Sequence, residues 1–254
     1  MNNKDWFVDW FDTSWYHLLY QNRNYAEAQR FIDNIVDYLG AQPGDLFMDL
    51  ACGKGRHSIY LAEKGFRVVG LDLSQESIQA AKRQENARLQ FDVHDMREKY
   101  VAQKFDYVLN LFTSFGYFET DEEHLDVLLN MKNALRNERS LLVLDFLNAP
   151  KVIKGLCPKE IIERENTVFK ITRTIESGYV HKKIVVVEGV KEYVFSERVR
   201  LYTLDDFEEL FAKAGLVVVD VFGDYDLNGF GFDEERLILV GRVDGVESLA
   251  LLAG

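Results

Sequence analysis

The sequence predicts an α/β fold: a doubly wound, seven-stranded sheet with an antiparallel last strand, and an antiparallel β insertion after the fifth strand. Up to about residue 150, short apolar runs alternate with helical patterns, as in a parallel sheet covered by helices on both faces. Residues 160–201 show no helical period and are typical of short strands separated by turns. A helical pattern and two final strands then return the chain to the main sheet.

The first half of the chain begins with helices and continues as alternating strands and helices. Residues 1–24 are rich in aromatic side chains interleaved with acids, and we expect an amphipathic helix that packs on the domain and also serves as a lid. Residues 25–39 have apolar side chains at helical spacing, and Gly40 ends that helix. Ser74 and Thr120 are expected N-caps. The expected strands are 46–51, 67–72, 88–93, 105–111 and 140–146, and the helices between them are 55–64, 75–84 and 121–135.

The second half contains the insertion and the end of the main sheet. Thr203 and Asp206 form a capping box that begins a helix over 203–214. The last two strands are joined by a connection too short for a helical crossover, so we expect an antiparallel hairpin. The expected strands are 160–166, 168–176, 179–188 and 191–202 in the insertion, and 216–222 and 236–242 in the main sheet.

These elements predict three parts in the chain. They are an N-terminal helical lid segment at 1–39, a ligand-binding domain at 40–150 and 203–243, and an antiparallel β insertion at 151–202 that forms a substrate lid. An exposed strand edge in the insertion could pair two chains, so a homodimer stays open.

Composition excludes several classes of partner. The net charge is −12, from 30 basic and 42 acidic residues, which argues against a protein that grips nucleic acid through phosphate contacts. We find no run of about 18 apolar residues and no signal-peptide pattern, so we expect no membrane span. Cys52 and Cys157 lie far apart, with no neighbouring metal-ligand pattern. We therefore expect a cytoplasmic protein without a metal site.

A glycine turn after the first strand, residues 49–55, is the centre of the predicted site. Strand, glycine turn and helix is how such sheets present a nucleotide-like ligand. A dinucleotide-binding turn has the pattern G-x-G-x-x-G, and here Ser58 stands at the third glycine. Asp49, just before the turn, would repel a pyrophosphate. Both observations argue against an NAD-dependent oxidoreductase. No G-K-[ST] follows, which excludes a P-loop. A cationic ligand suits the acid better.

The turn resembles the D-x-x-x-G-x-G signature of class I S-adenosylmethionine-dependent methyltransferases, over about residues 40–150 and 203–243. The resemblance implies a Rossmann-like fold, S-adenosyl-L-methionine as cofactor and S-adenosyl-L-homocysteine as product. In that family an acid ending the second strand, here Asp72, holds both ribose hydroxyls, since a carboxylate can accept two hydrogen bonds from a diol. An acid and an apolar residue after the third strand, here Asp95 and Met96, read the adenine.

A narrower resemblance is to a small-molecule branch that includes aminosugar N-methyltransferases. It rests on residues 112–117, on 145–148, on 200–203 and on an N-terminal pattern at 16–25. Together the two resemblances imply that the cofactor is held by Tyr16, Tyr20, Arg23, Asp49, Ala51, Gly53, Gly55, Arg56, His57, Asp72, Leu73, Asp95, Met96, Asn110 and Leu111.

Methyl transfer from a sulfonium is an in-line displacement that needs mainly positioning. An amine acceptor must only be neutral, whereas a hydroxyl needs a base. Tyr117 is the candidate for contact with the substrate or the sulfonium, and His17 is a candidate base. Asn148 could reach the substrate, whereas residues 224–226 lie in a hairpin loop and favour a solvated turn.

The acceptor is predicted to be a small molecule, with amine and hydroxyl acceptors both open and a lean toward nitrogen. One alternative is an RNA or protein methyltransferase, although Asn110 is not followed by the prolines typical of adenine-amino methylation. Another is a non-catalytic protein that binds S-adenosylmethionine.

Overall fold

A computed structural model describes residues 6–21 and 25–245. Its main sheet has seven strands in the order β10-β11-β5-β4-β1-β2-β3. The five strands from β1 to β5 pair in parallel, whereas β11 runs antiparallel to both of its neighbours. The predicted fold class is therefore confirmed. The strands are β1 (Leu46–Leu50), β2 (Arg67–Asp72), β3 (Leu89–Val93), β4 (Tyr107–Asn110), β5 (Leu141–Leu147), β10 (Leu216–Phe222) and β11 (Arg236–Val243).

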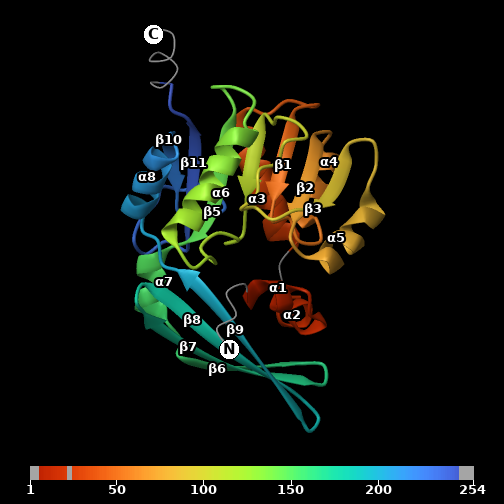
Figure 1. The fold of residues 1–254 in the computed structure, drawn as a ribbon, viewed down its shortest axis with the longest axis vertical. Helices are drawn as coiled ribbons and strands as arrows, with labels where there is room; N and C mark the ends of the chain where they lie inside the picture. The colour runs from red at the N-terminus through yellow and green to blue at the C-terminus, as the bar shows by residue number, and fades with distance from the viewer. Residues whose placement is uncertain (1–5, 22–24, 246–254) are drawn as a thin grey trace.

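Helices cover both faces of the main sheet (Figure 1). Buried side chains of α3, α4 and α5 form one hydrophobic core with the sheet, and those of α6 and α8 form the other. Each face is covered because the parallel strands are apolar on both sides. The helices are α3 (Tyr25–Leu39), α4 (Arg56–Glu63), α5 (Gln75–Ala81), which a short 3₁₀ turn follows (Lys82–Gln84), α6 (Asp121–Ala134) and α8 (Leu204–Lys213).

The insertion is a separate antiparallel sheet with the strand order β6-β7-β8-β9. It lies below the main sheet in Figure 1, and α1 and α2 lie between the two sheets. A third hydrophobic core joins Trp10 and Leu19 of these helices to β7 and β8. The elements are β6 (Lys159–Arg164), β7 (Thr167–Glu176), β8 (Tyr179–Glu188), β9 (Lys191–Arg200), α1 (Trp6–Phe11) and α2 (Ser14–Leu19).

Two local features differ from the sequence prediction. The N-terminal segment forms two short helices rather than one, because Thr13 is extended and its hydroxyl caps α2 by accepting the Tyr16 N–H at 3.1 Å. A helix that we did not predict, α7 (Ala149–Gly155), follows β5 and has a proline in its first turn, where the missing N–H costs nothing. Within the part of the chain that the structure describes, no helix is long and apolar enough to span a bilayer.

Candidate active site

A cavity of about 370 Å³ lies at the carboxyl ends of the parallel strands. Its floor comes from the segments that follow β1, β2, β3 and β4, and its opposite wall comes from the N-terminal helices. It is lined by Phe7, Phe11, Tyr16, His17, Tyr20, Gln21, Tyr25, Ala51, Cys52, Gly53, Lys54, Arg56, His57, Asp72, Leu73, Ser74, Ser77, His94, Asp95, Met96, Leu111, Phe112, Ser114, Tyr117 and Phe118.

The glycine turn after β1 needs both of its glycines. Gly53 and Gly55 have φ angles of 57° and 80°, which side chains disfavour. A Cβ on Gly55 would lie 2.5 Å from a ring carbon of Phe91, so that position also lacks room. No atom lies within 4 Å of a Cβ built on Gly53. The bare backbone at Gly53 therefore leaves space for a ligand to approach closely.

Asp72 ties this turn to the end of β2. One carboxylate oxygen accepts the Gly53 N–H at 2.8 Å, and the other accepts the Ser74 N–H at 2.8 Å. Each oxygen has a second lone pair that can accept a further hydrogen bond. Asp72 can therefore shape the turn and still receive two hydroxyl groups from a ligand.

Asp49 lies behind the turn instead of lining the cavity. Its side chain is buried, and it accepts a hydrogen bond of 2.5 Å from the buried Ser58 hydroxyl. Burial raises the pKa of Asp49 to about 6, although the Ser58 hydrogen bond opposes that rise. The first acid of the turn is therefore a poorly solvated carboxylate held beneath the cavity.

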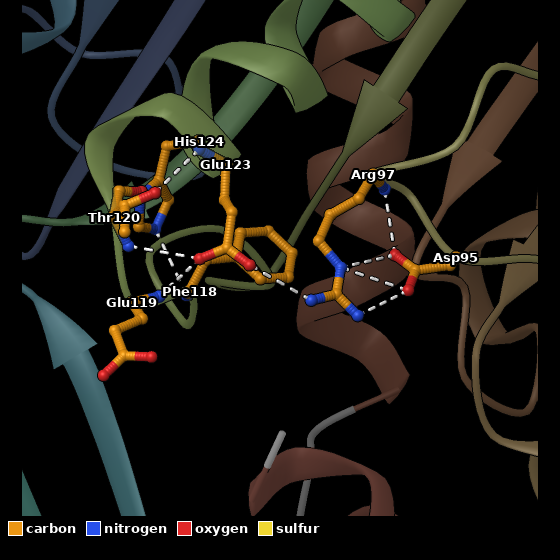
Figure 2. Close-up of polar contacts among 7 residues, drawn as sticks. All are labelled: Asp95, Arg97, Phe118, Glu119, Thr120, Glu123 and His124. Atoms are coloured by element: carbon orange, nitrogen blue, oxygen red, sulfur yellow. Dashed lines mark hydrogen bonds and ion pairs between the residues drawn. The ribbon is translucent and has the colours of Figure 1, made fainter. Parts of the chain in front are cut away.

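Asp95 lines the cavity from the segment after β3 and is held by Arg97. The Arg97 guanidinium donates to both Asp95 oxygens, at 3.1 and 2.6 Å, and also to Glu123 at 3.3 Å. Figure 2 shows Arg97 between the two acids, with Glu123 also capping α6. Burial raises the pKa of Asp95, but the hydrogen bonds from Arg97 outweigh it and hold the pKa below its usual value. Asp95 is therefore ionised and fixed in orientation.

The Arg97 guanidinium also contacts the aromatic side of the cavity. Its central carbon lies 5.6 Å from the Phe7 ring centroid and 5.1 Å from that of Phe118. Phe118 is held from behind by His124. Its N–H donates to Nε2 of the His124 ring at 3.3 Å. The ring proton therefore lies on Nδ1, which faces the Thr120 carbonyl (Figure 2). Arg97 thus links three parts of the site: Asp95 after β3, Phe7 of α1, and Glu123 in the first turn of α6.

Aromatic rings form the wall opposite the glycine turn. The ring centroids of Trp6, Phe7 and Phe11 lie 5.4, 6.4 and 5.5 Å from that of Tyr117. The Tyr117 hydroxyl donates to the Thr113 carbonyl, which fixes the ring. Because Phe7, Phe11 and Tyr117 also line the cavity, a ligand there meets aromatic side chains on this side.

A partly buried charged cluster joins the N-terminal helices to the insertion. Glu197 of β9 accepts hydrogen bonds from Trp10 at 2.8 Å and Tyr20 at 2.7 Å, and it pairs with Lys182 of β8 at 3.1 Å. Burial lowers the pKa of Lys182 despite the nearby Glu197. Because Tyr20 also lines the cavity, this cluster connects the insertion to the site.

The first half of the main sheet matches a family model. Residues 47–138 match the model described as a methyltransferase domain. This part of the chain is a methyltransferase domain, and the chain resembles the class I S-adenosylmethionine-dependent methyltransferases. The matched segment runs from β1 to the end of α6, so it includes the glycine turn, Asp72, Asp95 and the segment after β4.

Curated relatives of this methyltransferase include N-methyltransferases. The chain is 25% identical over 213 residues to dTDP-3-amino-3,4,6-trideoxy-alpha-D-glucopyranose N,N-dimethyltransferase from Streptomyces venezuelae, covering 80% of this chain and 89% of the relative. It is 27% identical over 234 residues to a glycine/sarcosine N-methyltransferase from Parasynechococcus marenigrum, covering 86% and 78%.

Solved structures share its fold. A methyltransferase from Clostridium acetobutylicum superposes with a TM-score of 0.77 at 20% identity, covering 90% of this chain and 96% of that one. An amino pentose methyltransferase from Micromonospora echinaspora superposes with a TM-score of 0.68 at 20% identity, covering 91% and 97%. The resemblance to aminosugar methyltransferases predicted from the sequence is therefore confirmed.

The methyltransferase cavity brings together most of the residues that the sequence singled out. Asp49 and Asn110 are buried behind the cavity instead of lining it. The Asn110 side chain donates to the Leu50 carbonyl at 2.9 Å. Gly55 shapes the turn. Arg23 lies outside the described residues. The predicted residues that line the cavity are Tyr16, His17, Tyr20, Ala51, Gly53, Arg56, His57, Asp72, Leu73, Asp95, Met96, Leu111 and Tyr117.

Several lining residues were not predicted, notably Phe7 and Phe11 of α1 and Phe112 of the methyltransferase segment after β4. Phe112 stood inside the segment that carried the aminosugar resemblance, so that signal was present. No comparable signal marked which N-terminal aromatic rings face inward. Arg97 and Glu197 were also missed, because Arg97 joins Asp95 to Glu123 and Glu197 joins Lys182 to Trp10 and Tyr20, and these partners are brought together only by the fold.

Proposed function

We propose that this methyltransferase acts on a small molecule and transfers the methyl group to a nitrogen or oxygen atom, with nitrogen favoured. The observation that carries the proposal is the cover of the cavity: α1 and α2 lie across it and line it with Phe7, Phe11, Tyr16 and His17. A roofed cavity suits a small acceptor better than a polymer. The N-methyltransferases among the relatives favour nitrogen, and the charge of −12 argues against RNA.

The residues of the cavity fit the cofactor. The open backbone at Gly53 and the crowded Gly55 form a turn that a ligand can approach. We assign the ribose hydroxyls to Asp72 and the adenine to Asp95 and Met96. Tyr16, Tyr20, Arg56 and His57 would surround the rest of the cofactor, with Ala51, Leu73 and Leu111 giving apolar contact. Asp49, Gly55 and Asn110 would support the site from behind.

The methyl group would be transferred on the aromatic side of the cavity. S-adenosylmethionine supplies a methyl group activated by a positively charged sulfur. Tyr117, with the rings of Phe7 and Phe11 around it, would favour a cation there and exclude water. The chain's main contribution is then to hold the acceptor in line with the leaving sulfur.

An amine acceptor must enter as the neutral base and lose a proton after transfer. His17 is the candidate to receive it: its ring lines the cavity, and its Nε2 lies 4.0 Å from a carboxylate oxygen of Glu76. A hydroxyl acceptor would need this group before transfer. We further propose that residues 1–39 and the insertion at 151–202 act together as the lid that selects the acceptor.

Calorimetric titration with S-adenosylmethionine tests the cofactor assignment. The wild type should give saturable heat, and Asp72→Ala should lose most of it. Asp92→Ala is the matched control, since Asp92 is an exposed acid on β3 that pairs only loosely with Lys82 at 3.6 Å. Circular dichroism checks folding, because Asp72 also holds the turn. Unchanged affinity in a folded Asp72→Ala variant contradicts the ribose assignment.

Acceptor classes are separated by transfer of a labelled methyl group. Incubation with amine, hydroxyl and bulk RNA substrates should give labelled product with amines and little on a nucleic-acid filter. Label on RNA would support the alternative of an RNA methyltransferase. Tight cofactor binding without turnover across all acceptors would support a non-catalytic binding protein.

A further inference from the structure

The segment after β4 contains two successive non-glycine residues in the left-handed region. Phe112 has a φ of 65° and Thr113 a φ of 58°. Side chains disfavour this conformation, so it persists only where neighbouring groups determine it. Both residues lie beside the cavity, which Phe112 lines directly.

Asp145, fully buried on β5, holds both residues. Its side chain accepts the Phe112 N–H at 2.8 Å, and its main-chain oxygen accepts the Thr113 N–H at 3.0 Å. The Tyr225 hydroxyl donates to the same carboxylate at 3.2 Å. The strained turn is thus fixed by hydrogen bonds from a neighbouring strand.

Arg236, at the start of β11, completes the arrangement. Its Nε donates to Asp145 at 2.7 Å, and its Nη2 donates to the Thr113 hydroxyl at 2.8 Å. The rigid guanidinium makes both contacts from one side chain. Thr113 in turn accepts the Tyr117 hydroxyl with its carbonyl. A continuous chain of contacts therefore joins Arg236 to Tyr117, which faces the cavity.

We propose that Asp145 and Arg236 are positioning residues that hold the segment after β4 so that Tyr117 and Phe112 face the sulfonium. This inference rests on the proposed function and extends it to residues behind the site. Neither side chain lines the cavity, so both act through Thr113 and Phe112. Residues 224–226, whose sequence favoured a solvated turn, supply Tyr225 to this arrangement.

The chemistry of the pair favours positioning over stability alone. A buried ion pair often stabilises a fold no better than apolar side chains of similar volume. Apolar replacements, however, could satisfy neither the Phe112 N–H nor the Thr113 hydroxyl. The Phe112 ring is held on another side by the Arg56 guanidinium, whose central carbon lies 4.8 Å from the ring centroid. Arg56 itself lines the cavity, so the ring position matters to the site.

The test compares the affinities for S-adenosylmethionine, a cation, and S-adenosylhomocysteine, which is neutral at sulfur. Arg236→Lys keeps the charge beside Asp145 but loses the second arm to Thr113. Thr113→Val removes the hydroxyl while keeping the branched shape. Each should shift the ratio of the two affinities toward S-adenosylhomocysteine by about fivefold, the size of one cation–aromatic contact. The double variant should shift it no further, because both changes break the same contact.

Thr113→Ser, which keeps the hydroxyl, is the control and should preserve the wild-type ratio. A purely structural role would lower both affinities equally or only the melting temperature, so an unchanged ratio in folded Arg236→Lys and Thr113→Val refutes the inference. If Arg236→Lys does not fold, the comparison of Thr113→Val with Thr113→Ser decides alone. A wild type that binds neither compound refutes the proposed function itself, which distinguishes the two failures.

Discussion

Replacing Asp49 by Asn should make the ligand-free methyltransferase more stable at neutral pH. Asp49 is buried beneath the glycine turn, and burial raises its pKa from 3.8 to about 6. The folded chain therefore binds this proton more tightly than the unfolded chain does. The contribution of Asp49 to the free energy of unfolding is therefore greatest below pH 3.8. It falls as the pH rises and is completely lost above about pH 6.

The size of the effect follows from the pKa difference. Two pKa units correspond to roughly 3 kcal/mol of stability lost at neutral pH. At about pH 4 the loss is only roughly 0.5 kcal/mol, because the carboxyl is then largely protonated in the folded state. Asn has no charge to bury, so the stability difference between variant and wild type should grow by about 2 kcal/mol from pH 4 to pH 7.5.

Urea unfolding of both proteins at these two pH values measures the difference. Any constant packing cost of the amide cancels when the two pH values are compared. Titration with S-adenosylmethionine at neutral pH should show the opposite sign, with weaker binding by Asp49→Asn because a carboxylate below the turn favours a cation. A stability difference that does not change with pH refutes the raised pKa of Asp49.

Two further variants address contacts that the sequence did not reveal. Arg97→Gln should raise the pKa of Asp95 toward its ordinary value, because the charge-assisted hydrogen bonds from Arg97 are lost. Calorimetry should then show S-adenosylmethionine binding that is about tenfold weaker. Unchanged affinity contradicts this role of Arg97. Glu197→Gln should lower the free energy of unfolding, measured in urea, by about 3 kcal/mol, because the largely enclosed ammonium of Lys182 loses its counter-charge. The exposed acid Glu192 is the control, and Glu192→Gln should cost less than about 1 kcal/mol.

The main sheet was predictable because its signals are local. Each strand is an apolar run, each helix has its own period, and caps such as Thr120 lie next to the helix that they begin. The insertion strands were predicted within two residues of their observed ends for the same reason. The break at Thr13 was missed because aromatic side chains on all sides of the N-terminal segment hide its period. The helix α7 was missed because Pro150 was interpreted as the end of an element.

The residues that line the cavity were predictable where each one directly follows a strand, and not where one residue acts through another. Asp72 and Asp95 end or follow strands, and the topology places all such ends at one edge of the sheet. Arg97 stands two residues after Asp95, yet its role depends on Glu123 and Phe118, which only the fold brings near. Residues behind the site, such as Asp145 and Arg236, form contacts with residues far away in the sequence, and no local sequence pattern predicts such contacts.

The two N-terminal helices connect the cavity to the insertion, which together with these helices is the proposed acceptor lid. A helix of six residues is unstable by itself, so α1 and α2 depend on tertiary contacts. On one side these are the rings around Tyr117, and on the other the contacts of Trp10 and Tyr20 with Glu197. Losing either set of contacts would remove the support of α1 and α2, which form a wall of the cavity. The insertion therefore contributes to the site through Glu197 although none of its residues lines the cavity.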